Sequence, residues 1–187
     1  MPTPTSFTDL ADALQRLSTN QPFLEALEKA TSLVREALLG GHKLLIAGNG
    51  GSAAEADHFA AEIVGHYMRV RKGYPAITLS TSAATVTAIG NDDGYEEVFA
   101  RQVQAYGLPG DVVIGITTSG NSKNIIRALE QAREMGLKTV CFLGRDGGAL
   151  REVPNVSLLV PETSTARIQE LHLLAIHTIC ESVDQAL

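Results

Sequence analysis

The chain has 187 residues, of which 44% are hydrophobic and 19% charged, and a formal net charge of -6. This length and balance are typical of one globular domain with its own core, and they exclude a disordered or fibrous chain. The acidic charge argues against a nucleic-acid partner, which normally needs a basic face. We expect a single domain over residues 1–187, with helices over 1–40 followed by an α/β core over 41–187.

No apolar run in the sequence approaches the roughly 18 residues that a membrane-spanning helix needs, so we expect no membrane partner. The N-terminal segment lacks a basic region leading into an apolar stretch, because Asp9 and Asp12 interrupt it, and we expect no signal peptide. Cys141 and Cys180 lie in apolar segments, as is typical of buried thiols in a reducing compartment. These features predict a cytoplasmic protein.

Helical spacing of apolar residues dominates the first forty residues. Leu10, Leu14 and Leu17 recur every three or four positions, and a second helical stretch follows Pro22 and ends at Gly40-Gly41. The long, largely apolar helix over 23–39 needs a partner surface, which favours an oligomer.

Five short apolar runs then alternate with helical segments. The predicted strands are Lys43–Ala47, Ala76–Leu79, Val112–Ile116, Thr139–Leu143 and Val156–Val160. The predicted helices are Ala53–Val64, Tyr95–Tyr106, Ser122–Met135 and one from Ser164 to the C-terminus. This order indicates an α/β fold with a doubly wound, five-stranded parallel sheet flanked by helices.

The first predicted strand is followed by the loop Gly48-Asn49-Gly50-Gly51-Ser52, which opens a helix. Open parallel sheets bind ligands outside the carboxyl ends of their strands, so a ligand can approach this backbone closely. The spacing matches the dinucleotide pattern G-x-G-x-x-A. The acidic residue that a ribose needs at the end of the next strand is missing, which disfavours a nicotinamide cofactor.

The third predicted strand is followed by Thr117-Thr118-Ser119-Gly120-Asn121-Ser122, in which four of six residues carry hydroxyl groups. Because this loop also opens a helix, it can surround an anion with O–H and N–H donors. Gly115 and Gly120 have P-loop spacing, but Asn121 stands where that motif requires lysine, which disfavours a triphosphate. Helix capping explains one or two of these polar residues. The four hydroxyl groups together favour a single phosphate.

Two helices carry candidate acid–base or metal-binding side chains. His58 and Glu62 lie four residues apart on one helix face. Three interpretations fit this spacing: a pair of metal ligands, a base with its partner, or a solvated surface pair. The last helix carries Gln169, Glu170, His172 and His177. Gln169 and His177 are two turns apart and could face one cleft, although a lone histidine on an apolar helix is more often structural.

Two other polar stretches have simpler interpretations. Asn91-Asp92-Asp93-Gly94 is typical of a polar turn that caps a following helix. Arg69, Arg71 and Lys72 are interpreted as a solvated basic run.

Taken together, five stretches of the chain resemble the sugar isomerase (SIS) domain family, and within it the isomerases of phosphorylated seven-carbon sugars. Each stretch alone is weak evidence, whereas five in the same order are specific. The resemblance covers most of the chain, from the N-terminal helices to the last helix. The five stretches are Gly48–Ser52, His58–Glu62, Gly90–Asp92, Thr118–Ser122, and Arg167–Glu170 with His172 and His177.

The resemblance implies an aldose–ketose isomerisation of sedoheptulose 7-phosphate to D-glycero-D-manno-heptose 7-phosphate through an enediol. In this family Glu62 would be the base and His177 the second acid/base. The phosphate would rest on Thr117, Thr118, Ser119 and Ser122. The sugar would be lined by Asn49, Gly50, Gly51, Glu62, Asn91, Asp92 and Gln169.

The resemblance also implies one zinc ion per subunit, held by His58, Glu62, Gln169 and His177. Imidazole and carboxylate suit zinc, and the metal could polarise a carbonyl group. Family members assemble as homotetramers with sites built between subunits, so we expect a homotetramer.

A non-catalytic relative provides the alternative interpretation: a phosphosugar-binding regulator that binds the replication initiator DnaA. It has very similar loops but lacks the counterparts of Glu62 and His177, which this chain carries, so the enzyme is favoured. The chain departs from the family pattern at two positions. His66 stands where many relatives have arginine, and Thr117 replaces a serine while keeping the hydroxyl group.

Overall fold

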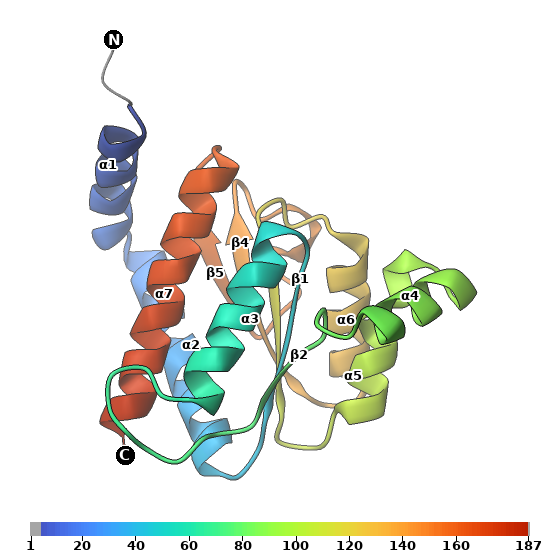
Figure 1. The fold of residues 1–187 in the computed structure, drawn as a ribbon. Helices are drawn as coiled ribbons and strands as arrows, with labels where there is room; N and C mark the ends of the chain where they lie inside the picture. Colours follow the sequence, from blue (N-terminus) through green and yellow to red (C-terminus); the bar gives the residue numbers. More distant parts are fainter. Residues whose placement is uncertain (1–4, 187) are drawn as a thin grey trace.

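The computed structural model describes residues 5–186; the first four residues of the N-terminal segment and the last residue lie outside them. Its centre is a parallel five-stranded sheet with the order β2-β1-β3-β4-β5 (Figure 1). The strands are β1 (Leu44–Gly48), β2 (Ala76–Thr78), β3 (Val112–Thr117), β4 (Lys138–Gly144) and β5 (Val156–Val160). The predicted parallel sheet is confirmed, and each predicted strand end lies within one residue of the observed one.

Helices cover both faces of the sheet. One face packs against α2 (Gln21–Leu39), α3 (Gly51–Val64) and α7 (Thr165–Gln185), and α1 (Ser6–Ser18) packs on α7. The opposite face packs against α5 (Ala100–Tyr106) and α6 (Lys123–Glu134). The side chains of β1 alternate between the two cores, with Leu44 and Ile46 on the first face and Leu45 and Ala47 on the second. This double burial explains why the strands are continuous apolar runs.

The order of the strands places a topological switch between β1 and β3. From β1 the chain crosses to the edge strand β2, whereas from β3 it continues to β4 and β5 on the other side. The helix that follows β1 and the helix that follows β3 therefore leave on opposite faces of the sheet. Their loops diverge at the carboxyl edge, which is where open α/β sheets bind ligands.

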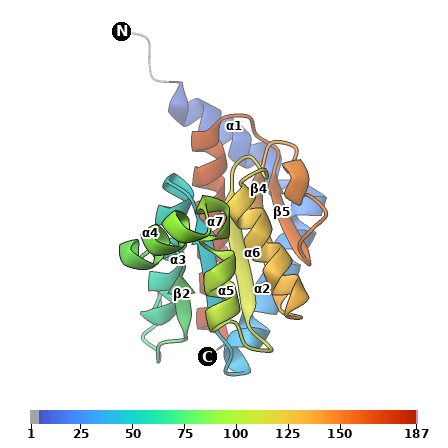
Figure 2. The same ribbon diagram turned by 90° about the vertical axis from the view of Figure 1, so that its right-hand side faces the viewer.

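Helix α4 (Ala83–Asp92) was not predicted from the sequence. Ser82 begins it by accepting a hydrogen bond from the Thr85 amide at 3.2 Å. Its β-branched Thr and Val residues have modest helix propensity, and none of its residues is fully buried, although Val86 and Ile89 pack against the second core. Figure 2 shows α4 projecting from the body of the molecule.

Two predictions about the neighbouring segment are corrected. Asn91 and Asp92 form the end of α4, and the expected turn before a helix begins only at Asp93. The predicted helix over Tyr95–Tyr106 is a short 3-10 turn over Tyr95–Glu97 followed by α5. Gly94, with a φ of 97°, separates α4 from this turn.

Two smaller features of the described part of the chain complete the fold. Cys141 and Cys180 are buried and unpaired, as expected. Within residues 5–186, no helix combines the length and the apolar character that crossing a bilayer would demand.

Candidate active site

The loop after β1 is held in shape by a network of side-chain hydrogen bonds. Asn49 and Asn124 donate their amide groups to each other, both at 2.9 Å. The Tyr95 hydroxyl donates to Asn49 Oδ1 at 3.0 Å. Gly50 has a φ of 56°, which favours glycine, and it leads directly into α3. Asn124 and Tyr95 were not singled out from the sequence, because neither belongs to a recognisable motif.

Gln169, from the first turns of α7, reaches the start of α3. A Cβ atom added at Gly51 would lie 2.2 Å from Gln169 Nε2. The glycine therefore makes room for the amide, and the glycine loop and the last helix meet at this point.

The hydroxyl loop after β3 gathers three of its predicted residues around one point. Thr117 Oγ1 lies 2.9 Å from Ser122 Oγ and 3.4 Å from Ser119 Oγ. Ser122 occupies the N-cap position of α6, yet its side chain makes no capping hydrogen bond. The capping interpretation thus fails for this serine. The hydroxyl groups and the N-terminus of α6 face the same point, as an anion site requires.

The backbone of this loop requires glycine at position 120. Gly120 has a φ of 66°, and an added Cβ atom would lie 1.9 Å from the Gly147 carbonyl oxygen. Asn121 turns away from the point where the hydroxyl groups gather. Its side chain donates to the Ser119 carbonyl oxygen at 2.9 Å and accepts from the Ala149 amide at 3.0 Å. Thr118, also predicted to hold phosphate, is half-buried in the same loop.

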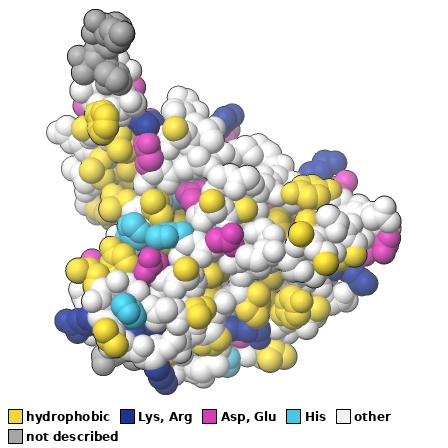
Figure 3. Space-filling view, in the orientation of Figure 1, with side chains coloured by type: hydrophobic (Ala, Val, Ile, Leu, Met, Phe, Trp, Pro, Cys, Tyr) yellow, Lys and Arg dark blue, Asp and Glu magenta, His cyan; other side chains and the backbone are white. Residues whose placement is uncertain are grey.

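His58, Glu62 and His177 come together from α3 and α7. The two imidazole Nε2 atoms lie 2.8 Å apart, within hydrogen-bonding distance. Glu62 Oε1 lies 3.7 Å from His58 Nε2. Burial, together with the neighbouring His58, lowers the pKa of His177 below its ordinary value. The solvated-pair interpretation fits the partial exposure of His58 and Glu62, but it does not account for the third titratable group, His177, that the second helix brings onto them. Histidine and acidic side chains lie together on this face in Figure 3.

A hollow of about 480 Å³ links the glycine loop with the hydroxyl loop. Its lining residues are Asn49, Asp93, Gly94, Tyr95, Glu96, Ser122, Lys123 and Asn124. Asn91 and Asp92, predicted to line the sugar, are exposed at the end of α4, where Asn91 donates to Asp92 Oδ1 at 2.8 Å. Asp93, the next residue along the chain, lines the hollow in their place.

Two other members of the predicted cluster on α7 face away from the site. His172 is fully buried and its Nε2 lies 3.0 Å from the Leu143 carbonyl oxygen. Its Nδ1 lies 3.9 Å from Glu55 Oε1, and neither this nitrogen nor the Glu55 carboxylate oxygens have a hydrogen-bond partner. Burial raises the pKa of Glu55 to about 7 and lowers that of His172 to about 4. Glu170 is exposed and pairs with Arg167 at 2.6 Å.

The basic run after α3 is not uniformly solvated, which corrects the sequence interpretation. The Arg71 side chain is only 6% exposed and pairs with the buried Asp184 at 2.7 Å. Tyr67, four residues earlier, stacks on the His177 ring with centroids 5.2 Å apart and planes inclined by 27°. The helical and strand periodicities that guided the sequence analysis carry no signal for such a loop.

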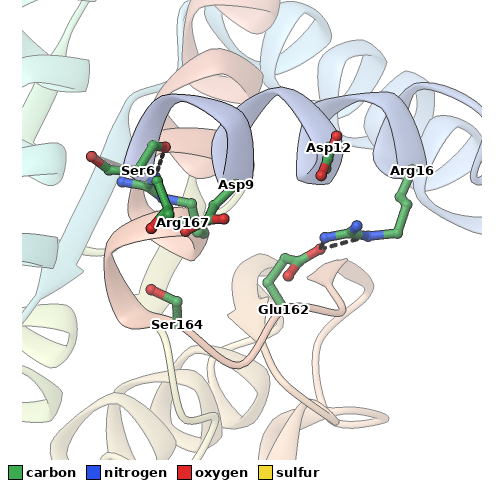
Figure 4. Close-up of a pocket in the computed structure, with 8 residues that line it drawn as sticks. Ser6, Asp9, Asp12, Arg16, Glu162, Ser164 and Arg167 are labelled. Atoms are coloured by element: carbon green, nitrogen blue, oxygen red, sulfur yellow. Dashed lines mark hydrogen bonds and ion pairs between the residues drawn. The ribbon is translucent and has the colours of Figure 1, made fainter. Parts of the chain in front are cut away.

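A separate hollow of about 640 Å³ lies between α1 and the beginning of α7 (Figure 4). Arg16 and Glu162 form an ion pair across it at 2.7 Å, and Arg167 donates to the Ser6 carbonyl oxygen. None of the predicted site residues lines this hollow, so it is distinct from the candidate active site.

Three of the predicted zinc ligands, His58, Glu62 and His177, are of types that zinc prefers, whereas Gln169 is an uncommon zinc ligand. In the described residues 5–186, no group of three or more His, Cys, Asp or Glu side chains is arranged to hold a metal ion. The imidazole nitrogens of His58 and His177, at 2.8 Å, hydrogen-bond to each other. Imidazole and carboxylate are nevertheless donors that zinc prefers, so the residues fit the ion in chemistry.

Comparisons with known proteins agree with this geometry. The family model described as "SIS domain" matches residues 7–144. A phosphoheptose isomerase from Aliarcobacter butzleri is 53% identical over 163 residues, covering 87% of this chain and 86% of that protein. The structure of phosphoheptose isomerase from Neisseria gonorrhoeae superposes with a TM-score of 0.90 at 41% identity, covering 97% of this chain and 96% of that one. The structure of a phosphoheptose isomerase from Francisella tularensis superposes with a TM-score of 0.92 at 36% identity, covering 97% of this chain and 95% of that one.

The chain belongs to the SIS domain family and, within it, to the phosphoheptose isomerases. It is therefore an isomerase that acts on a phosphorylated sugar. The alternative of a non-catalytic regulator is not supported, because these relatives are named as enzymes.

Proposed function

We propose that the chain is a cytoplasmic aldose–ketose isomerase that converts sedoheptulose 7-phosphate to D-glycero-D-manno-heptose 7-phosphate. This reaction would be the first step of nucleotide-activated heptose biosynthesis. The observation that carries the proposal is the convergence of Glu62, His58 and His177 from two helices at one site. The names of the relatives support a seven-carbon sugar phosphate as the substrate.

In this proposal Glu62 is the base of the isomerisation. Its carboxylate takes a proton from the carbon next to the carbonyl group, an enediol forms, and the proton returns to the neighbouring carbon. His177 is the second acid/base and moves a proton at the substrate oxygens. The lowered pKa of His177 suits this role, since a neutral imidazole carries one donor and one acceptor nitrogen. Without a bound metal, the hydrogen bond with His58 orients the ring.

The substrate phosphate is assigned to the hydroxyl loop. Thr117, Ser119 and Ser122 present hydroxyl groups near one point, and Thr118 lies between them. The amide groups at the start of α6 add partial positive charge. Asn49, Gly50, Gly51 and Gln169 would line the sugar. No lysine or arginine is needed for a single phosphate held in this way.

Asn91 and Asp92 enter the proposal through the expected homotetramer. They are exposed at the end of α4, which buries none of its residues in the described chain. In an assembly with sites between subunits, they would contact the sugar from α4 of a neighbouring copy. Light scattering coupled to gel filtration tests the assembly, and a monomeric enzyme with full activity would exclude this role for the two residues.

We propose zinc as the metal, held by His58, Glu62, Gln169 and His177. Bound zinc supplies a Lewis acid that polarises the substrate carbonyl. Elemental analysis of protein purified without added metal tests this independently of activity. We expect about one zinc per chain in the wild type and a large loss in His58→Ala. Equal metal content in both proteins would remove the proposed site.

Replacement of Glu62 by glutamine tests the proposed reaction. The variant keeps the shape of the side chain but removes the base, so turnover of sedoheptulose 7-phosphate should fall by about 10²–10⁴-fold. Asp57→Asn is the matched control, because Asp57 is an exposed carboxylate on the same helix. Product analysis should find the aldose in the wild type and in the control. Undiminished turnover by Glu62→Gln would reject Glu62 as the base.

A further inference from the structure

The segment over residues 65–74, which we call the strap, connects α3 to β2 and passes the C-terminal part of α7 (Figure 1). Its fixed point on α7 is Asp184, which is 2% exposed. Asp184 accepts hydrogen bonds from the backbone amides of Met68 at 2.6 Å and Arg69 at 2.9 Å. It also accepts one from Arg71 Nε at 2.7 Å. One buried carboxylate thus binds three residues of the strap.

Apolar burial does not hold the middle of the strap. The side chains of Met68 and Val70 are 72% and 91% exposed, and Arg69 is also exposed. The far end is fixed differently, by the buried Tyr74, whose amide donates to the Ile63 carbonyl oxygen at 3.1 Å. The position of the middle of the strap therefore depends on the polar contacts with Asp184.

Arg71 connects the strap to the end of α3. Its Nη2 donates to the Glu62 carbonyl oxygen at 2.9 Å, and its Nη1 donates to the Ile63 carbonyl oxygen at 2.9 Å. These carbonyl groups belong to the last turn of the helix, which has no basic residue of its own there. A cation at this point satisfies them and complements the helix dipole. The guanidinium group thus fixes the turn that carries the Glu62 side chain.

The strap also carries Tyr67, which lies on His177. The two rings are stacked with centroids 5.2 Å apart. Tyr67 directly precedes the two residues whose amides bond to Asp184. Burial would raise the pKa of Asp184, but the two amides and Arg71 outweigh it and hold the pKa below its ordinary value. The contacts with the strap therefore favour the charged form of this carboxylate.

We propose that the Arg71–Asp184 pair and Tyr67 are positioning residues for Glu62 and His177. Asp184 holds the strap, Tyr67 on the strap fixes the plane of the His177 ring, and Arg71 fixes the last turn of α3 at Glu62. The proposal rests on the proposed function in that Glu62 and His177 are taken as the acid–base pair.

Asp184→Asn tests the proposal, because it keeps the shape of the side chain and removes the charge that binds Arg71. We expect kcat with sedoheptulose 7-phosphate to fall by about 10–100-fold, as for a displaced catalytic group, with KM little changed. Tyr67→Leu should lower kcat in the same way. Tyr67→Phe keeps the stacked ring and should restore kcat to near the wild-type value.

Asp111→Asn is a matched control for lost stability. Asp111 is also 2% exposed, pairs with Lys43 and accepts hydrogen bonds from the amides of Lys43 at 3.0 Å and Leu108 at 2.7 Å. It precedes β3, so it lies at the opposite edge of the sheet from the site. Its replacement should lower the free energy of unfolding as Asp184→Asn does, yet leave kcat unchanged.

The NMR signal of the His177 ring gives a second readout that does not depend on turnover. The signal is assigned by its loss in His177→Gln. Because Tyr67 stacks on this ring, its ring current shifts the His177 carbon-bound protons. The signal should move in Tyr67→Leu and Asp184→Asn and stay in place in Asp111→Asn.

Three results would overturn the proposal: Asp184→Asn leaves the His177 signal in place, it moves the signal without lowering kcat, or Asp111→Asn lowers kcat equally. A wild-type protein that does not turn over sedoheptulose 7-phosphate would overturn the proposed function instead. In that case the His177 signal alone decides whether Asp184 positions the ring.

Discussion

The amide group of Gln169 occupies the space that a side chain at Gly51 would need, with Nε2 only 2.2 Å from the position of an added Cβ atom. This contact joins the first turn of α3 to the first turns of α7. It brings a predicted sugar-lining backbone and a predicted metal ligand to one place.

Gly51→Ala should therefore fold and yet lose activity. The methyl group meets the end of a flexible side chain and not a rigid backbone, so Gln169 can move aside at little cost in stability. We expect kcat/KM for sedoheptulose 7-phosphate to fall by about 10-fold or more, since small displacements of positioned groups are costly. Steady-state kinetics and thermal unfolding measure the two effects.

A double-mutant cycle shows whether Gln169 carries this effect. In a Gln169→Ala background, Gly51→Ala should reduce kcat/KM little further, because the displaced group is already gone. Losses that simply multiply would mean that the alanine methyl group acts on the substrate itself.

Ser122→Ala should weaken anion binding without destabilising the fold. The Ser122 side chain does not cap α6, so its loss costs no helix stability, while a hydroxyl group is removed from the proposed phosphate site. Ser82→Ala is the opposite case, because Ser82 does cap α4 and its loss should cost about 1 kcal/mol. Calorimetric titration with inorganic phosphate and chemical unfolding measure both. Unchanged phosphate affinity in Ser122→Ala would contradict the assignment.

Asn124→Ala should impair both stability and activity. The substitution leaves the Asn49 amide donor without its partner and removes one of the hydrogen bonds that Asn49 Oδ1 accepts. The free energy of unfolding should fall by about 1–3 kcal/mol. The glycine loop should then be less well positioned, and kcat should fall.

Asn155→Ala is the control for Asn124→Ala. Asn155 accepts hydrogen bonds from the Thr139 amide at 2.8 Å and the Thr139 hydroxyl at 3.0 Å, near the amino end of β4. Its loss should lower stability alone. If Asn155→Ala reduced kcat as strongly, the effect of Asn124→Ala would have to be attributed to general loosening.

Glu55 and His172 make opposing contributions to the pH dependence of stability. Burial raises the pKa of Glu55 to about 7 in the folded chain, whereas the unfolded carboxyl group has a pKa near 4.5. The stability that the protonated Glu55 contributes is therefore lost as the pH rises between those values. His172 stays neutral when folded down to about pH 4, whereas the unfolded ring takes up a proton near 6.5. Its contribution is therefore lost as the pH falls between those values.

Glu55→Gln should separate the two contributions. Relative to the wild type, the variant should gain stability as the pH rises from about 5 to about 8, by at most about 3 kcal/mol. His172→Gln should instead lose less stability than the wild type as the pH falls through 6.5 to 4. Urea unfolding at several pH values measures both. A stability difference that does not change with pH would mean that neither group titrates as its burial implies.

The sheet and the loops at its carboxyl edge could be predicted because their signals are local. Continuous apolar runs such as Val112–Ile116 indicate doubly buried strands, and glycine and hydroxyl residues directly after a strand indicate a ligand loop. The pairing of Gln169 with Gly51 and of His177 with His58 followed the expectation that the last helix faces the same cleft.

The remainder depends on contacts that no local pattern encodes. The sequence placed Arg71 on the surface because it stands in a basic run. In the structure it is buried and pairs with the carboxylate of Asp184, 113 residues away in sequence. Helix α4 escaped prediction because its β-branched residues have modest helix propensity and none of its residues is fully buried. His172, which the sequence grouped with Gln169 and His177 on the last helix, points into the core toward Leu143, in agreement with the structural interpretation of a lone histidine.

The division of labour across the sheet has a consequence for how such a molecule can change. The groups proposed to move protons lie on α3 and α7, which cover one face of the sheet. The groups proposed to bind the anion lie at the end of β3 and in the loop before α6, a helix that covers the other face. The residues of one group can therefore be substituted without repacking the helices that position the other group. A different phosphorylated sugar could therefore be accommodated by substitutions on α3 and α7 while the phosphate-binding loop after β3 stays unchanged.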